Sequence, residues 1–269
     1  MIRIIAVLCC LWGTPLVAGE LELKGAFTQG GLILGKTAPG ASISLNGKEI
    51  RVSDTGEFVF GFGRDHKAEA LLEVKRPDGT ITKKRLKISK RQYKTERING
   101  LPPSKVTPSE QFLKRIRREN GEIAKIRAID TDEKWFLTGW KWPASGRISG
   151  VFGSQRVLND IPKRPHYGLD IAAPVGTPVF SSTDGLVRLS EQDLYYTGGT
   201  VMIDHGYGLV SVYSHLSKLS VKAGQFVKQG EKIGEIGATG RASGPHLDWR
   251  LNWFKERLDP QLLLEGRAN

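Results

Sequence analysis

Three of the five histidines of this chain, His166, His215 and His246, fall in short segments between residues 166 and 248, and two of them stand near a carboxylate. His166 precedes Asp170, His246 precedes Asp248, and His215 lies between the two pairs. Imidazole nitrogens and carboxylate oxygens are the donors of a catalytic zinc site, which uses three protein ligands and leaves a fourth position for water. This group of residues therefore predicts a metal site with hydrolytic chemistry.

The spacing within each pair fits short strands. Side chains two residues apart on a strand point to the same face, so His246 and Asp248 can converge on one point. His166 and Asp170 have the same parity, although Gly168 between them makes a bent strand edge equally compatible with the sequence. A lone histidine is more often a core or surface residue than a ligand, so the prediction depends on the whole group.

The same segments resemble the lysostaphin-type (LytM-like) zinc metallopeptidases, which cut peptidoglycan peptides. The resemblance runs from about Trp142 to Leu264 as a series of ordered blocks, which are residues 146–153, 166–174, 176–179, 204–208, 213–216 and 239–247. It implies an exported zinc metalloendopeptidase that hydrolyses the peptide cross-links of bacterial peptidoglycan.

Carried over position by position, the resemblance implies that His166 and Asp170 are metal ligands. It implies that His215 and His246 are the catalytic histidines and that the third ligand is residue 248. The family normally has a histidine there, whereas this chain has Asp248. Aspartate still binds zinc through oxygen at a similar distance, although its side chain is shorter.

The aspartate has a chemical consequence, because one histidine and two carboxylates formally cancel the charge of Zn²⁺. A less positive metal polarises a carbonyl less and lowers the pKa of bound water less. We therefore expect slower hydrolysis, a shift to higher pH, or a preference toward manganese or magnesium. The alternative is a non-catalytic peptidoglycan-binding or amidase-activating relative that needs a partner amidase. We favour retained catalysis, because the other four site residues are present.

The remaining sequence indicates an exported protein of two domains, since 269 residues are enough for both. Residues 1–19 have the features of a secretory signal peptide: Arg3, an apolar run from Ile4 to Trp12, and small residues at Ala18 and Gly19. Both cysteines lie in this leader, so we expect a mature protein without disulfides. We predict a periplasmic or secreted location and no membrane span.

The predicted fold class is mostly β. Residues 20–98 alternate between apolar and polar positions in short runs, which favours an immunoglobulin-like sandwich. Two-residue hairpin turns are expected at Asn46-Gly47 and Asp78-Gly79. Residues 99–139 are predicted to be a linker and a helix, with Thr107 as N-cap, Pro108 next and the helix continuing to about residue 127. Residues 140–266 are predicted to be an antiparallel β metallopeptidase domain.

The net charge of +12 draws an exported protein toward anionic surfaces such as cell-wall polymers. Lysine and arginine are spread widely and form no stripe with aromatic residues, so nucleic acid is not a predicted partner. Residues 221–234 have the valine–glycine rhythm of biotinyl and lipoyl carrier domains but no lysine on a tight exposed hairpin, so we interpret them as sheet scaffold. His66 and His205 are predicted to be non-catalytic.

Overall fold

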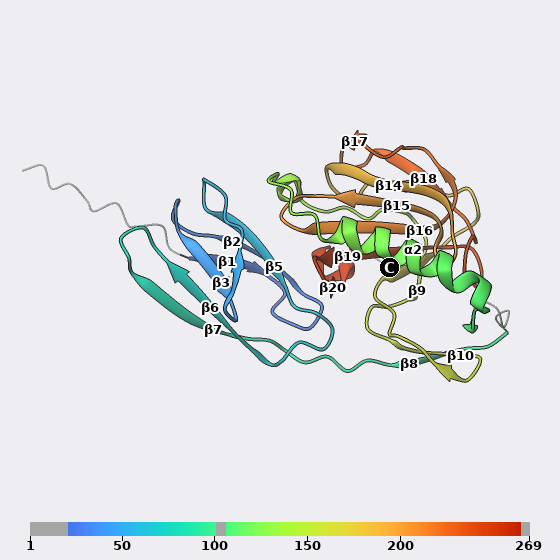
Figure 1. Cartoon of the computed structure of the whole chain (residues 1–269), viewed down its shortest axis with the longest axis horizontal. Coiled ribbons are helices and arrows are strands. Elements are labelled where there is room, and N and C mark those ends of the chain that lie inside the picture. The colour runs from blue at the N-terminus through green and yellow to red at the C-terminus, as the bar shows by residue number, and fades with distance from the viewer. Residues whose placement is uncertain (1–20, 101–105, 265–269) are drawn as a thin grey trace, which may run out of the picture.

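The computed structural model describes residues 21–100 and 106–264, and the predicted signal peptide therefore lies outside the described residues. The described chain is mostly β, as predicted. Figure 1 shows small sheets in the amino-terminal part and a large sheet in the carboxyl-terminal part, with a long helix beside the large sheet. Within the described residues, none of the helices has the length and apolar character that crossing a bilayer requires.

The amino-terminal part contains two antiparallel sheets around one core. The first has the order β1-β2-β5, with β1 (Glu22–Gly25), β2 (Leu32–Lys36) and β5 (Glu57–Gly61). The second has the order β4-β3-β6-β7, with β4 (Lys48–Ile50), β3 (Ser42–Leu45), β6 (Glu69–Lys75) and β7 (Ile81–Lys87). Alternation decides which face is buried: in β6, Ala70, Leu72 and Val74 point into the core and the residues between them do not.

One of the two predicted hairpin turns is confirmed. Asn46 and Gly47 both have positive φ, 51° and 78°, as a two-residue turn requires. At the other turn the prediction is wrong, because Arg76 N–H donates to Thr80 C=O at 2.9 Å and leaves three residues in the turn. Pro77 favours the second position of a four-residue turn, and this turn closes through Gly79 N–H to Arg76 C=O at 2.9 Å.

The connection between the two parts contributes a strand to the carboxyl-terminal part. β8 (Thr95–Ile98) pairs in parallel with β10 (Gln155–Leu158), which in turn pairs with β11 (Ile161–Pro162). Helix α2 (Glu110–Arg127) then begins after Ser109, so the predicted N-cap at Thr107 is two residues early. The extended backbone of Ser109, with ψ of 160°, delays the first helical residue to Glu110.

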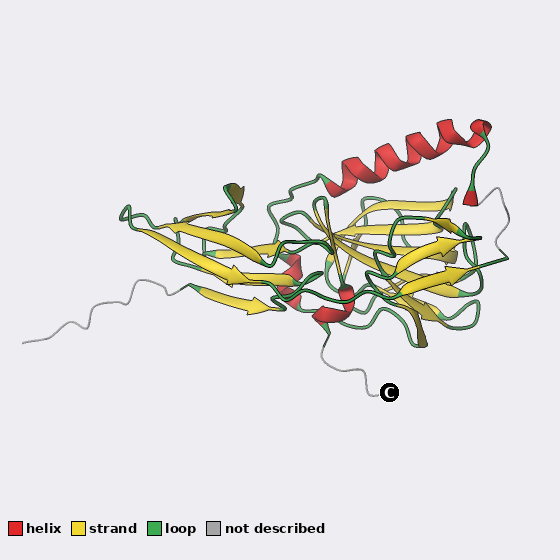
Figure 2. Cartoon of the chain, turned by 90° about the horizontal axis from the view of Figure 1, so that it is seen from below, coloured by secondary structure: helices red, strands yellow, loops and turns green. Residues whose placement is uncertain are grey.

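The carboxyl-terminal part is built on a ten-stranded antiparallel sheet whose main path is β17-β14-β15-β16-β19-β12-β9. Its strands are β9 (Arg147–Gly150), β12 (Leu169–Ala172), β13 (Pro178–Phe180), β14 (Gly185–Leu194), β15 (Gly198–Asp204), β16 (Leu209–Leu219), β17 (Phe226–Val227), β18 (Lys232–Ile236), β19 (His246–Trp253) and β20 (Glu256–Leu258). Short 3₁₀ helices span Trp135–Thr138 and Pro260–Leu263. In Figure 2 helix α2 runs alongside this sheet, and its Ile123 and Ile126 pack on Met202 and Val210.

The two parts share a hydrophobic core. Phe58 and Phe60 of the amino-terminal sheet belong to one buried cluster with Leu251 and Leu258 of the carboxyl-terminal sheet. The approach is so close that a Cβ on Gly61 would lie 2.6 Å from a methyl carbon of Leu258, which explains a glycine within β5. The amino-terminal part is therefore packed against the sheet that carries the site.

Candidate metal centre

Two carboxylates face each other across neighbouring strands. β12 and β19 are antiparallel, and their register places Asp170 directly opposite Asp248 and Ala172 opposite His246. Because side chains alternate along a strand, His246 and Asp248 share one face of β19. The register therefore gathers both carboxylates and an imidazole at one point of the sheet.

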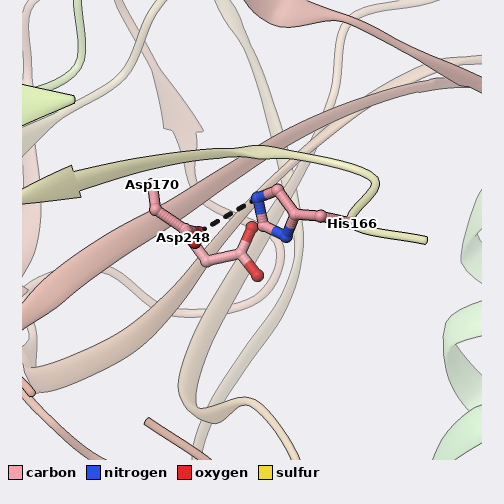
Figure 3. A group of neighbouring side chains, drawn as sticks. All are labelled: His166, Asp170 and Asp248. Carbon is pink, nitrogen blue, oxygen red and sulfur yellow. Dashed lines mark ion pairs between the residues drawn. The ribbon is translucent and has the colours of Figure 1, made fainter. Parts of the chain in front are cut away.

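His166 reaches the same point from the segment that precedes β12. Gly168 allows this approach, because a Cβ at that position would lie 2.4 Å from Asp248 Oδ1. The donor atoms of His166, Asp170 and Asp248 all lie within 4.8 Å of one another. Figure 3 shows the three side chains converging, with His166 Nε2 3.1 Å from Asp170 Oδ1.

The three side chains are buried, and two of them, His166 and Asp170, are incompletely hydrogen-bonded. Only 2% of His166 and 1% of Asp248 is exposed. Neither ring nitrogen of His166 has a hydrogen-bond partner among the described residues, and the same holds for Asp170 Oδ1. Buried polar atoms without partners are costly, and a cation between these donors would satisfy them. One imidazole and two carboxylates are also donors that suit zinc, so the residues fit the metal that the sequence predicts.

Two arginines neutralise the carboxylates. A terminal nitrogen of Arg156 lies 2.6 Å from Asp170 Oδ2. Arg250 binds both oxygens of Asp248: its Nε donates to Oδ1 at 2.9 Å and to Oδ2 at 3.1 Å, and its terminal Nη2 also donates to Oδ2. Like charges placed directly opposite each other destabilise an antiparallel pair, so these guanidiniums provide the compensating charge.

Both carboxylates are held ionised. Burial by itself would raise the pKa of Asp248, but the charge and hydrogen bonds of Arg250 outweigh burial and hold that pKa far below its ordinary value. Burial also opposes ionisation of Asp170, yet its pKa is lowered because His166 and Arg156 stabilise the anion. The site therefore presents two carboxylates that can act as ligands at neutral pH.

His215 stands beside this group in an unusual backbone conformation. Its φ is +67°, which is rare for a residue other than glycine and often marks a functional position. Its Nδ1 lies 2.8 Å from the carbonyl oxygen of Thr239, which can only accept, so Nδ1 carries the proton and Nε2 is left as an acceptor. Burial lowers the pKa of His215 to about 4, so the ring is neutral near pH 7.

His246 is oriented in the same manner. Its Nδ1 lies 2.8 Å from the carbonyl oxygen of Gly244, and its Nε2 lies 3.9 Å from Asp170 Oδ1. The centroids of the two rings, His215 and His246, are 4.7 Å apart. Two imidazoles therefore stand next to the three candidate ligands, each with Nε2 available for proton transfer.

A cleft of about 350 Å³ gives access to these residues. Asp170, His215 and His246 line it, together with Arg241, and β8 contributes a wall from Glu96 to Ile98. A larger groove of about 730 Å³ lies at Arg64, Lys67 and Lys255 and contains none of the five predicted site residues. The larger groove is therefore not the candidate active site. The smaller cleft is, because Asp170, His215 and His246 line it.

Comparison with known proteins identifies this part of the chain. Residues 164–260 match the model of peptidase family M23. The chain carries an M23 peptidase domain. The resemblance found in the sequence is therefore confirmed, and all five predicted site residues fall inside the matched M23 region.

Several curated relatives are similar to part of this chain. The peptidoglycan DD-endopeptidase ShyA of Vibrio cholerae is 46% identical over 113 residues, which cover 41% of this chain and 25% of ShyA. The cell division protein DipM of Caulobacter vibrioides is 39% identical over 153 residues, 53% of this chain and 24% of DipM. The chain thus spans about a quarter of the length of these two relatives.

One solved structure is similar over nearly the whole chain. A candidate M23 peptidase from Pseudomonas aeruginosa is 29% identical and superposes with a TM-score of 0.68. The similarity covers 88% of this chain and 94% of the other. It therefore extends beyond the M23 domain into the amino-terminal sheets.

Sequence reasoning about the M23 domain missed the two arginines and the wall made by β8. Arg250 could have been found, because it is two residues beyond Asp248 and therefore on the same strand face. Arg156 reaches Asp170 through a strand pairing that no short-range pattern reveals. His205 is a structural residue: Nδ1 lies 2.7 Å from Asp184 C=O and Nε2 lies 2.7 Å from Ser211 Oγ.

Proposed function

We propose that this protein is an exported zinc metalloendopeptidase that hydrolyses peptide cross-links of bacterial peptidoglycan. The observation that carries the proposal is the convergence of His166, Asp170 and Asp248 beside two imidazoles whose Nε2 atoms are available. The M23 domain supplies the reaction class, and the name of ShyA suggests the substrate class. Peptidoglycan is accordingly the proposed partner, and the cell envelope is the proposed location.

His166, Asp170 and Asp248 would hold the zinc. The chemistry that a bound zinc supplies is polarisation of the scissile carbonyl and acidification of a water molecule. The protein's own part is proton transfer: Nε2 of His246 or His215 accepts a proton from the attacking water. The imidazolium formed in this way passes the proton to the leaving amine, and the other imidazole, when Nε2 is protonated, donates a hydrogen bond to the developing oxyanion. The cleft between β8 and β19 would hold the peptide in line with these groups.

The amino-terminal part serves, in this proposal, as a positioning domain. Its two packed antiparallel sheets support an immunoglobulin-like sandwich over residues 20–98. Residues 99–139 would be the linker and helix, and residues 140–266 the metallopeptidase domain. Because β8 forms a wall of the cleft, this domain would also help to shape the substrate site.

Digestion of purified peptidoglycan tests the proposal. Full-length protein with zinc should release peptide fragments, mass spectrometry should locate the cut within a cross-link, and a chelator should stop the reaction until zinc is restored. Manganese and magnesium should be tried in parallel, since a carboxylate-rich site favours harder ions. Absence of peptide cleavage with all three metals would contradict the proposal.

A second candidate is a non-catalytic peptidoglycan-binding protein that stimulates a partner amidase. The observation favouring it is Arg250, whose guanidinium already satisfies both oxygens of Asp248. One set of assays distinguishes the endopeptidase from the amidase stimulator. A stimulator would leave purified wall intact alone, bind it in a sedimentation assay, and accelerate stem-peptide release when a wall amidase is added.

A further inference from the structure

Arg250 and Asp248 form the most fully satisfied ion pair of the site. Both residues are on β19 and two positions apart, so they project from the same strand face. Nε of Arg250 contacts both carboxylate oxygens at 2.9 and 3.1 Å, and Nη2 adds a further bond to Oδ2. The pairing is buried at its acidic end, where only 1% of Asp248 is exposed.

The second arginine–aspartate pair is different. Arg156 binds only Oδ2 of Asp170, at 2.6 Å, and leaves Oδ1 without a hydrogen-bond partner. That free oxygen points toward His166 Nε2, 3.1 Å away, and toward His246 Nε2, 3.9 Å away. Asp170 can thus offer an oxygen to a cation while it keeps its arginine, whereas Asp248 has both oxygens engaged.

A divalent cation at this point meets Arg250 as a competitor. A guanidinium and a metal ion both seek the lone pairs of Asp248, and two positive charges on one carboxylate repel each other. A metal that binds Asp248 must share oxygens that Arg250 already contacts, so each cation weakens the hold of the other on this carboxylate. The guanidinium is therefore a resident counter-ion that can stabilise the paired carboxylates when no metal is bound.

We propose that Arg250 competes with the divalent cation for Asp248 and thereby sets the metal affinity of the site. The inference rests on one part of the proposed function, which is that His166, Asp170 and Asp248 bind a divalent cation. It makes Arg250 a positioning residue that acts through Asp248. It also makes the two residues one unit, because Asp248→His alone would leave the guanidinium unpaired beside an imidazole and a cation.

Zinc affinity of the full-length protein tests the inference without relying on turnover. Titration against a chromophoric chelator should show that Arg250→Gln binds zinc at least about tenfold more tightly than wild type, the usual scale for groups contacting a ligand. Arg156→Gln is the matched control, since it removes the same charge beside the other carboxylate. Its affinity change should be clearly smaller. Asp248→His should bind less tightly than the double variant Asp248→His/Arg250→Gln.

Loss of Arg250 also leaves a buried carboxylate unpaired, so stability must be measured alongside. Arg250→Gln should melt at a lower temperature without metal and gain more from added zinc than wild type does. Arg250→Lys keeps the charge but loses the two-pronged geometry, and its affinity should fall between wild type and Arg250→Gln. An unfolded Arg250→Gln that refolds on addition of zinc would support the inference.

The inference is overturned if Arg250→Gln binds zinc no more tightly than wild type, or if Arg156→Gln has the same effect. Peptidoglycan digestion separates this failure from failure of the proposed function. If wild type digests peptidoglycan and Arg250→Gln binds zinc with the affinity of wild type, only the role of Arg250 is contradicted. If Arg250→Gln binds zinc more tightly than wild type but no variant digests peptidoglycan, the role of Arg250 is supported and the proposed peptidase activity is contradicted.

Discussion

Asp170 lies directly opposite Asp248 in the antiparallel pairing of β12 with β19. Such a pair of buried carboxylates destabilises a sheet unless positive charge compensates it. Arg156 and Arg250 compensate it here, and the open oxygen of Asp170 faces His166 and His246. The pair therefore explains both why the site can hold a cation and why two arginines stand beside it.

The role of His215 in proton transfer predicts a specific loss. His215→Ala should reduce wall digestion by at least about a hundredfold, the scale of one general acid–base group. Zinc content should stay near that of wild type, because His215 is not one of the three converging donors. Product release followed by chromatography measures the first and elemental analysis the second. Loss of zinc together with activity would instead make His215 a structural support of the site.

Removal of Asp248 should weaken metal binding and leave Arg250 without its partner. We expect Asp248→Ala to lower zinc affinity at least about tenfold, since one of three ligands is gone. Asp193→Ala is a suitable control, because that carboxylate is 82% exposed and lies outside the site. Calorimetric titration of both variants makes the comparison. Equal zinc affinity in Asp248→Ala and wild type would exclude Asp248 as a ligand.

His205 predicts how stability changes with pH. Burial lowers the pKa of His205 to about 4, whereas an unfolded histidine titrates near 6.5. Below pH 6.5 the unfolded chain binds a proton that the folded protein does not, so stability decreases as pH falls toward 4 and is fully present above 6.5. The expected contribution of His205 to the free energy of unfolding above pH 6.5 is about 3 kcal/mol. Urea unfolding at pH 7.5 and 4.5 should show a smaller pH dependence in His205→Gln than in wild type.

The shared core predicts that the two parts of the chain unfold together. Leu258 is fully buried in the cluster that contains Phe58 and Phe60, so Leu258→Ala should cost about 2–5 kcal/mol. Leu262, which is 37% exposed, provides a matched control with a much smaller expected loss. Denaturation followed by limited proteolysis should report both parts melting at once. Two separate transitions in wild type would contradict a common core.

The resemblance to the lysostaphin-type peptidases predicted that His166, Asp170 and Asp248 gather at one site, and strand parity and residue type are compatible with that gathering. Their meeting depends on alternation along β19 and on a glycine bend before β12, which are both local properties. Of the two alternatives for the first pair, the bent edge is the observed one, since β12 begins only at Leu169. The M23 family was predictable from the sequence because its characteristic sequence blocks are short and occur in a fixed order.

Long-range pairing could not be predicted in the same manner. The parallel pairing of β8 with β10 joins Glu96 to Arg156 across 60 positions, and it places the last strand of the predicted first domain on the wall of the cleft. No periodicity in either segment specifies that register. The helix start was wrong by two residues, because Ser109 and Thr107 are both acceptable caps and only the backbone at Ser109 distinguishes them.

The most direct test of the metal site is zinc titration of the full-length protein, compared with its His166→Ala variant. His166 is the only imidazole among the three converging donors, and it belongs to neither arginine pair. The account predicts saturable uptake of one zinc per chain by wild type and loss of that uptake in His166→Ala. Equal uptake by the two proteins, or none by wild type, would contradict it.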